Sequence, residues 1–278
     1  FEQKAGSFDK DKWKDFLIFV EQERGDIHPV AFELIGEARK MASKVNFKVK
    51  CVIAGGAGTI ENAHKLLDYG VDQVFAYEDE SLEGFRADCY TDVVAECIAA
   101  QKPSSVLIGA TALGRSLAPR LATRFHTGLT ADCTTLDIKS NTDMVQIRPA
   151  FGGNIMATIV CEDFRPQMAT VRPGVMKALE ADESRQGEVE VVEVNFTDAD
   201  MNVKIREVVK TTHKSVDITE AKILVAGGRG VGNAEGFKDL EALADTLDGE
   251  VAASRAAVDS GWILSLIHIS EPTRRSYI

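Results

Sequence analysis

The sequence predicts an α/β protein whose N-terminal domain is a mainly parallel, open sheet sandwich with an antiparallel extension. Short apolar runs with the length of buried strands recur along the first half of the chain. Segments with apolar residues at helical spacing separate these runs, and this alternation requires right-handed crossovers between parallel strands. Near the other end, a glycine-rich loop lies between a strand and a helix, which indicates a second α/β unit.

The alternation begins with the apolar run 16–20, which is expected to be a central strand covered on both faces. Pro29 then begins a helix that continues to about residue 45, because proline is favoured at the first helical position and apolar residues recur on one side. The same signals predict strands at 49–54, 71–77 and 105–109, and helices at 59–68, 84–101 and 113–125.

Two glycine-containing segments follow strands of the predicted parallel sheet, Gly55–Gly58 and Gly109–Arg115. In open α/β sheets ligands bind beyond the carboxyl ends of the strands, so a pocket for an adenine nucleotide is one interpretation. Turn glycines are also common after strands that bind nothing. We favour this second interpretation from the sequence.

From residue 127 the pattern changes. Residues 127–134 are polar and are expected to form a loop. The strands that follow are rich in Ile, Val, Thr and Met and are interpreted as the antiparallel extension; they span 145–148, 155–161 and 167–172. A further strand at 189–194 completes a first domain that is predicted to span residues 1–205.

Three arginines in this region stand close to proline or glycine: Arg148, Arg165 and Arg172. They could anchor a phosphate or a neighbouring domain. They could instead pair with acidic side chains at the strand ends. The candidates for such pairing are Glu162, Asp163 and Asp132.

A linker at 206–220 is predicted to lead into a second α/β domain at 221–263. Its elements are expected to be a strand at 222–226, an amphipathic helix at 235–247 and a strand at 250–253 that delivers Ser254 and Arg255.

The loop Gly227–Gly232 between the first strand and the helix has the composition of a phosphate site. Its backbone N–H groups can approach an anion because no Cβ obstructs them, and the helix N-terminus favours negative charge. Asn233 stands where the third glycine of a dinucleotide fingerprint belongs. The loop alone therefore predicts half of a nucleotide site.

Composition limits the function classes. The chain has 278 residues, of which 45% are hydrophobic and 27% charged, as in ordinary globular proteins. No stretch reaches the roughly 18 apolar residues of a membrane span, and the N-terminus lacks a signal-peptide pattern, so we predict a cytoplasmic chain without membrane insertion. The formal net charge of −11 argues against binding to nucleic acid.

The cysteines indicate neither a disulfide nor a metal site. They are widely separated and form no Cys-x-x-Cys pair; they are Cys51, Cys89, Cys97, Cys133 and Cys161. The five histidines are equally scattered. We predict reduced and mostly buried thiols, no metal site and no catalytic residue.

Four motifs in order resemble the electron transfer flavoprotein alpha subunit family, with similarity over residues 14–263. They are Thr-Gly-Leu-Thr-Ala-Asp-Cys at 127–133, the runs 148–158 and 165–176, and Gly-Gly-Arg-Gly at 227–230 followed by Ala-Ser-Arg-Ala-Ala-Val-Asp at 253–259. The resemblance implies FAD as cofactor, with Arg229, Ser254 and Arg255 as flavin-binding positions. It places Arg255 beside the isoalloxazine ring, where a guanidinium stabilises the negative charge of a reduced flavin.

The resemblance also implies an electron carrier rather than a substrate-transforming enzyme. Members form a heterodimer with a beta subunit and pass electrons through FAD between acyl-CoA dehydrogenase-type flavoenzymes and a downstream acceptor, as in fatty acid oxidation. Some members bifurcate electrons, which the alpha chain alone does not decide.

Two other functions are compatible with parts of the sequence. The first is an adenine-nucleotide-binding module of the universal-stress-protein kind. The second is an NAD-dependent dehydrogenase, which is disfavoured by Asn233 and by Asp248, because Asp248 precedes the strand 250–253 instead of ending it.

The last residues are expected not to belong to the fold. Leu264–Arg274 resembles the translation of a sequencing-library adapter, so 264–278 is interpreted as a non-native tail. We therefore expect a C-terminally truncated chain in which 221–263 forms only the first part of an FAD-binding domain. Such a chain is expected not to hold FAD by itself.

Overall fold

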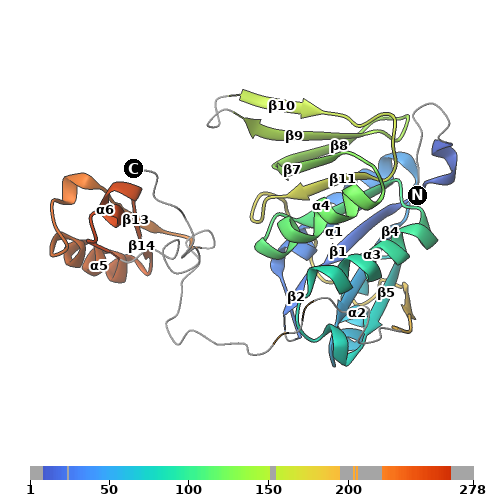
Figure 1. Cartoon of the computed structure of the whole chain (residues 1–278), viewed down its shortest axis with the longest axis horizontal. Coiled ribbons are helices and arrows are strands. Elements are labelled where there is room, and N and C mark those ends of the chain that lie inside the picture. The colour runs from blue at the N-terminus through green and yellow to red at the C-terminus, as the bar shows by residue number, and fades with distance from the viewer. Residues whose placement is uncertain are drawn as a thin grey trace. The chain divides into compact units, whose positions relative to one another are not determined.

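The computed structural model describes residues 9–23, 25–150, 155–194, 203, 205 and 221–263. It divides into two compact units, residues 1–206 and 207–278 (Figure 1). The predicted linker 206–220 and the predicted tail 264–278 lie outside the described residues.

A parallel sheet of seven strands forms the centre of the first unit, in the order β12-β5-β4-β1-β6-β11-β7. Its strands are β1 (Phe16–Val20), β4 (Val49–Gly55), β5 (Gln73–Glu78), β6 (Ser105–Gly109), β7 (Leu129–Cys133), β11 (Gln167–Val171) and β12 (Glu188–Val191). Every residue of β1 is buried because helices cover both faces of the sheet. The predicted fold class is confirmed.

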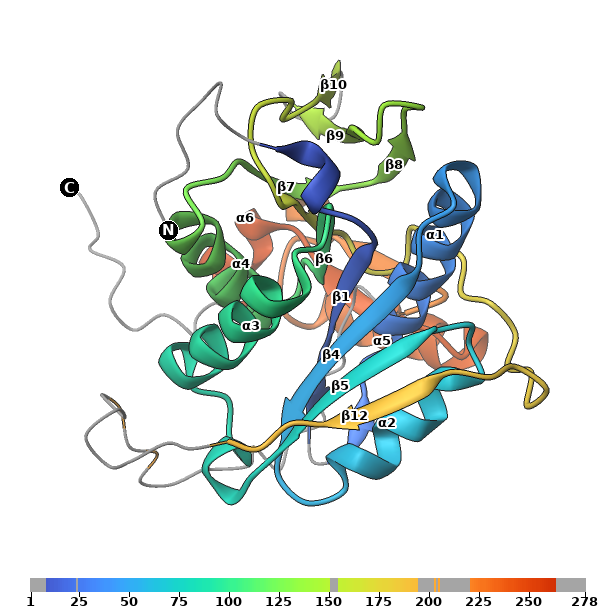
Figure 2. The ribbon, with the colours of Figure 1, turned by 90° about the vertical axis from the view of Figure 1, so that its right-hand side faces the viewer.

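The helices are divided between the two faces (Figure 2). The first face carries α1 (Pro29–Val45) and α2 (Thr59–Leu67), and the second carries α3 (Ala87–Gln101) and α4 (Ala112–Arg124). Alternate residues of β1 join the two hydrophobic cores: Phe16 and Ile18 pack with α1, and Leu17 packs with α3 and α4.

Local capping explains where these helices begin and end. Pro29 is the first residue of α1, and the His28 Nδ1 accepts a hydrogen bond from the Val30 N–H at 3.2 Å. Asn46 ends α1 in the left-handed conformation. At α4, the Thr111 Oγ1 accepts from the Gly114 N–H at 3.0 Å. These bonds satisfy backbone groups that helix ends leave unpaired.

A separate antiparallel sheet has the order β10-β9-β8, from β8 (Thr135–Ile138), β9 (Met144–Ala150) and β10 (Ile155–Ile159). The strand predicted at 167–172 does not belong to it. That strand is β11, which pairs in parallel with β6 and β7 and is buried throughout. Strand β8 was not predicted.

The expectation of a loop at 127–134 is wrong. Residues Leu129–Cys133 form β7, the last strand of the parallel sheet. Its polar composition is compatible with an edge strand, because only part of each edge residue is covered. Asp132 has a positive φ of 60°, at the place where the pairing with β11 is irregular.

The connection from β11 to β12 crosses α1. The Glu33 carboxylate of α1 accepts hydrogen bonds from the Gly174 N–H at 3.0 Å and the Met176 N–H at 3.1 Å. A Cβ built at Gly36 would stand 2.5 Å from the Lys177 carbonyl oxygen, so this approach to the helix requires glycine.

Short elements complete the first unit. They are η1 (Lys10–Lys12), β2 (Gln22–Glu23), β3 (Asp26–Ile27) and η2 (Glu80–Leu82).

The second unit contains a βαβ arrangement. Its elements are β13 (Leu224–Gly227), η4 (Arg229–Val231), α5 (Gly236–Leu247), β14 (Glu250–Ala253) and α6 (Arg255–Asp259). Strands β13 and β14 pair in parallel. Phe237 and Ala244 are the buried residues of α5, and a Cβ at Gly227 would stand 2.6 Å from the Leu240 side chain, so the helix lies close against β13. The helix α6 was not predicted.

Candidate functional site

The parallel pairing of β13 and β14 brings the two ends of the predicted cofactor site together. Gly227 is in register with Ala253, so Gly228 and Ser254 follow the two strands at the same carboxyl edge. The Ser254 N–H donates to the Gly227 carbonyl at 2.8 Å, and a Cβ built at Gly228 would stand 3.4 Å from the Ser254 Oγ. Two motifs that are separate in the sequence therefore form one edge.

The loop at this edge is a single tight turn. The Val231 N–H donates to the Gly228 carbonyl at 3.0 Å, and Gly232 has a φ of 85°, which glycine adopts without strain. A Cβ at Gly230 would meet nothing within 4 Å, so the loop has open space beside it. Arg229 lies in this turn with an exposed side chain.

Asn233 has a structural role in place of the missing third glycine. Its Oδ1 accepts from the Gly236 N–H at 3.0 Å, at the first residue of α5. One of the N–H groups at this helix end is therefore already satisfied by the protein. The loop consequently differs from a dinucleotide fingerprint in bonding as well as in sequence.

Ser254 and Arg255 start the short helix α6. The Ser254 carbonyl accepts from the Ala257 N–H at 3.0 Å, while its side chain is exposed and makes no capping bond to the helix. The Arg255 guanidinium is exposed and its Nε lies 3.4 Å from the Asp259 Oδ2. The edge thus presents one hydroxyl and two guanidinium groups, with glycine backbone between them. This donor set fits an anionic cofactor such as FAD.

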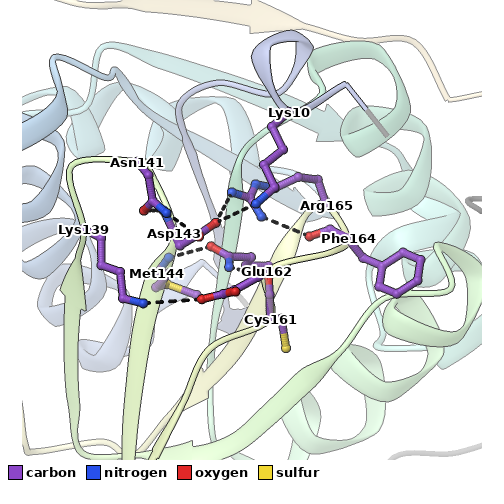
Figure 3. A network of polar contacts seen from close by, with 10 residues as sticks. Lys10, Lys139, Asn141, Asp143, Met144, Cys161, Glu162, Phe164 and Arg165 are labelled. Carbon is purple, nitrogen blue, oxygen red and sulfur yellow. Dashed lines mark hydrogen bonds and ion pairs between the residues drawn. The ribbon is translucent and has the colours of Figure 1, made fainter. Parts of the chain in front are cut away.

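A second polar cluster lies inside the first unit (Figure 3). Its centre is Asp143, whose side chain is 1% exposed and whose Oδ1 accepts from the Arg165 Nη2 at 2.7 Å. Lys10 approaches the same oxygen at 3.4 Å, and the Asn141 Nδ2 donates to Oδ2 at 2.8 Å. Burial alone would raise the pKa of Asp143, but Arg165 and Lys10 hold it below the usual value.

The same cluster joins the seven-stranded and the three-stranded sheets of the first unit. The Gln167 Oε1 accepts from the Met144 N–H at 2.6 Å, and its Nε2 donates to the Cys161 carbonyl at 2.6 Å. Gln167 belongs to the parallel sheet and Met144 to the antiparallel sheet. Arg165 is completely buried, so it anchors the fold and cannot contact an external phosphate. Its partner Asp143 was not among the acids proposed from the sequence.

Arg172 makes the pairing that the sequence suggested with Asp132. Its Nη2 lies 2.6 Å from the Asp132 Oδ2, and its Nε donates to Oδ1 at 3.1 Å. Arg115 approaches the same carboxylate at 3.8 Å. The hydrogen bond from Arg172, with the charges of Arg115 and Arg148, lowers the pKa of Asp132.

The carboxyl edge of the parallel sheet carries its own carboxylates. A pocket of about 610 Å³ lies there beside Gly55 and Gly56, with Glu78, Asp79 and Glu83 in its lining. The Glu78 Oε2 accepts from the Ile60 N–H at 2.9 Å, in the first turn of α2. An internal carboxylate therefore takes the place where a nucleotide phosphate would bind. This arrangement does not favour the adenine-nucleotide interpretation.

The thiols are reduced, and four of the five are buried; Cys161 is partly exposed. Burial raises the pKa of Cys97 to about 12 and that of Cys133 to about 11. Within the described residues, no group of three or more His, Cys, Asp or Glu could hold a metal ion. In the same part of the chain, no helix has the length and hydropathy of a membrane span.

Comparisons with known proteins cover both units. Residues 16–197 match the electron transfer flavoprotein domain family, and residues 217–270 match the electron transfer flavoprotein FAD-binding domain family. The electron transfer flavoprotein subunit alpha of Thermoanaerobacterium thermosaccharolyticum is 46% identical over 254 residues, which are 91% of this chain and 76% of that relative.

Other relatives carry different names. The protein FixB of Clostridium saccharobutylicum is 44% identical over 260 residues, covering 93% of this chain and 77% of the relative. The lactate dehydrogenase (NAD(+),ferredoxin) subunit LctC of Acetobacterium woodii is 42% identical over 268 residues, covering 96% of this chain and 64% of the relative.

Proposed function

This chain belongs to the electron transfer flavoprotein alpha subunit family, and we propose that Arg229, Ser254 and Arg255 hold its FAD. The observation that carries the proposal is the meeting of the glycine loop and Ser254 at one edge of β13 and β14. FAD supplies the redox chemistry when bound.

Each residue has a distinct role in this proposal. The turn with Arg229 offers backbone N–H groups and a cation to the pyrophosphate. The exposed Ser254 hydroxyl offers a further hydrogen bond. The Arg255 guanidinium carries a positive charge, so it stabilises the negative charge that the cofactor gains on reduction.

Substitution of the two arginines in the FAD-loaded heterodimer tests these roles. Arg255→Ala should lower the midpoint potential of the bound FAD, with Arg255→Lys between the two. Arg229→Ala should weaken FAD retention by about tenfold, which corresponds to about 1.4 kcal/mol. Lys222→Ala is the control, because Lys222 precedes β13 and lies at the opposite edge. Equal effects of all these substitutions would contradict the assignment.

We propose further that the beta subunit binds the antiparallel sheet. Ile155 and Met156 on its edge strand β10 are 53% and 54% exposed. Free proteins avoid apolar edge strands, since such edges recruit other chains. Arg148 on the neighbouring β9 adds positive charge to a chain of net charge −11, which suits an acidic segment of the partner.

Size-exclusion chromatography after co-expression with the beta subunit tests this interface. Met156→Lys should release the beta subunit, because a charge would be buried without a partner. Thr135→Lys is the matched control, since Thr135 is exposed on β8 at the other edge of the same sheet. If the Met156→Lys variant still co-elutes with the beta subunit, the proposed interface on the antiparallel sheet is wrong.

For the electron donor we propose an acyl-CoA dehydrogenase-type flavoenzyme. A relative 40% identical to this chain, from Anaerotignum propionicum, is named acryloyl-CoA reductase electron transfer subunit beta. Reduction of the FAD by such a dehydrogenase and its acyl-CoA substrate, followed by stopped-flow absorbance, tests the proposal. Reduction no faster than by free substrate would contradict it. We also propose a cytoplasmic location, as expected from the sequence, and cell fractionation tests it.

Electron bifurcation is the second candidate. The observation that favours it is the similarity to a subunit whose name includes both NAD(+) and ferredoxin. Counting flavins per heterodimer distinguishes the two modes. Two FAD molecules would support bifurcation, and one FAD with one AMP would support a simple carrier.

A further inference from the structure

The geometry points to Asp259 as the positioning residue for Arg255. By pairing with the Arg255 guanidinium, Asp259 reduces the positive charge that acts on the flavin. The inference rests on the proposed function, because it assigns a regulator to the same site. Its starting point is the ion pair between the Arg255 Nε and the Asp259 Oδ2, 3.4 Å apart at the two ends of α6.

The pair is too exposed to serve the fold. The Arg255 side chain is 78% exposed and that of Asp259 is 54% exposed. Ion pairs in water contribute roughly 0–1 kcal/mol to stability. The helix is instead held by Ala257, which is buried, and by hydrogen bonds from the N–H groups of Ala257 and Val258 to the Ser254 carbonyl. Loss of the pair should leave α6 in place.

The spacing of the pair explains how Asp259 can act on Arg255. Residues four apart lie on the same side of a helix, so the carboxylate draws the guanidinium along α6. A carboxylate at this distance also cancels part of the guanidinium field. Because a bound flavin excludes water from the edge, the attraction within the pair should strengthen in the loaded protein. Asp259 therefore opposes the stabilisation of reduced FAD by Arg255.

A double-mutant cycle in the FAD-loaded heterodimer tests the inference. Asp259→Asn keeps the shape of the side chain and removes its charge. It should shift the equilibrium between oxidised and reduced FAD towards the reduced form by at least about threefold, measured as the midpoint potential. In the Arg255→Ala background the same substitution should shift it by less than about 1.5-fold, since no guanidinium remains to be released.

Asp245→Asn makes the same charge change near the end of α5, away from the carboxyl edge, and should have no effect on the potential. No shift with Asp259→Asn, a shift towards oxidised FAD, or an equal shift in both backgrounds would overturn the role of Asp259. Absence of FAD from the unmodified heterodimer would overturn the proposed function instead, so the two failures are distinguishable.

Discussion

At the scale of single residues, the first unit depends on a buried charge that is fully partnered. Asp143 is surrounded by Arg165, Lys10 and Asn141, and the carboxylate would be costly to bury without them. The content of Ile, Val, Thr and Met predicted the strands at 145–148 and 167–172 that follow the two residues, but no sequence rule connects Asp143 with Arg165. Pairing across a fold follows from topology, and the topology here includes a second sheet.

Arg165→Met tests the energetic weight of this pair. Removal of one member of a buried ion pair leaves an uncompensated charge, so the free energy of unfolding should fall by about 3–5 kcal/mol. Urea denaturation measures it. Lys10→Ala removes the longer and more exposed contact and should cost less than about 1 kcal/mol. The double variant Asp143→Leu, Arg165→Met should recover part of the loss; a loss equal to the sum of the two single substitutions would show that the groups act independently.

The pH dependence of stability follows from the lowered pKa of Asp143. A carboxyl with a lower pKa in the folded state binds fewer protons in that state than in the unfolded one. Its contribution to the free energy of unfolding is therefore fully present above the unfolded pKa of about 3.9. The contribution is lost as pH falls from there through the folded pKa. Asp143→Asn should therefore flatten the acid limb of a plot of unfolding free energy against pH. A limb of unchanged slope would contradict the assignment, and Asp26→Asn, at an exposed acid of β3, is the control.

At the scale of elements, local signals were sufficient where the spacing of apolar residues and the residues at helix starts mark an element. The predicted helix at 29–45 and strands at 105–109 and 250–253 agree with α1, β6 and β14 residue by residue. The errors lie at 127–134 and 167–172, where pairing partners decide the structure. A short apolar run such as Gln167–Val171 fits either sheet type, and only its contacts with β6 and β7 make it parallel. In the second unit, the sequence correctly predicted a strand, a glycine loop and a helix in the places of β13, the turn with Arg229 and α5. The helix α6 was not predicted, because its five residues are too few to show apolar residues at helical spacing.

Gly114 allows the helix α4 to pack close against the backbone of β6. A Cβ at this position would stand 1.9 Å from the Gly109 carbonyl oxygen, which belongs to the backbone of β6. Gly114→Ala should therefore push α4 from the sheet and lower the free energy of unfolding by about 2–4 kcal/mol despite the better helix propensity of alanine. Thermal unfolding followed by circular dichroism measures this. Ser116→Ala, on the exposed side of the same helix, should be neutral or slightly stabilising; equal stability of both variants would refute the close approach.

At the scale of the whole molecule, the two units differ in how well they bury their apolar residues. The first unit has two cores, one on each face of its sheet. In the second unit, Phe237, Ala244 and Ala257 are buried, whereas Leu224 on β13 and Leu247 on α5 are exposed. The boundary after residue 205 and the linker at 206–220 stay predictions, which limited proteolysis between the units would test.

The exposed apolar residues of the second unit lead to the last prediction, which concerns FAD retention. Ile223, Leu224, Leu243 and Leu247 are each between 41% and 48% exposed, and a sheet of two strands is marginal by itself. Full burial of such side chains contributes about 1.5–3 kcal/mol each, so a segment that covers them should order the carboxyl edge and tighten FAD. We expect the 278-residue chain, co-expressed with the beta subunit, to retain at least about tenfold less FAD after desalting than a chimera. The chimera joins residue 263 to the segment that follows the matched region in the Thermoanaerobacterium thermosaccharolyticum relative, of which the match covers 76%. A chimera with the same segment in scrambled order is the control, and equal flavin absorbance in all three proteins would show that the described βαβ arrangement holds the cofactor unaided.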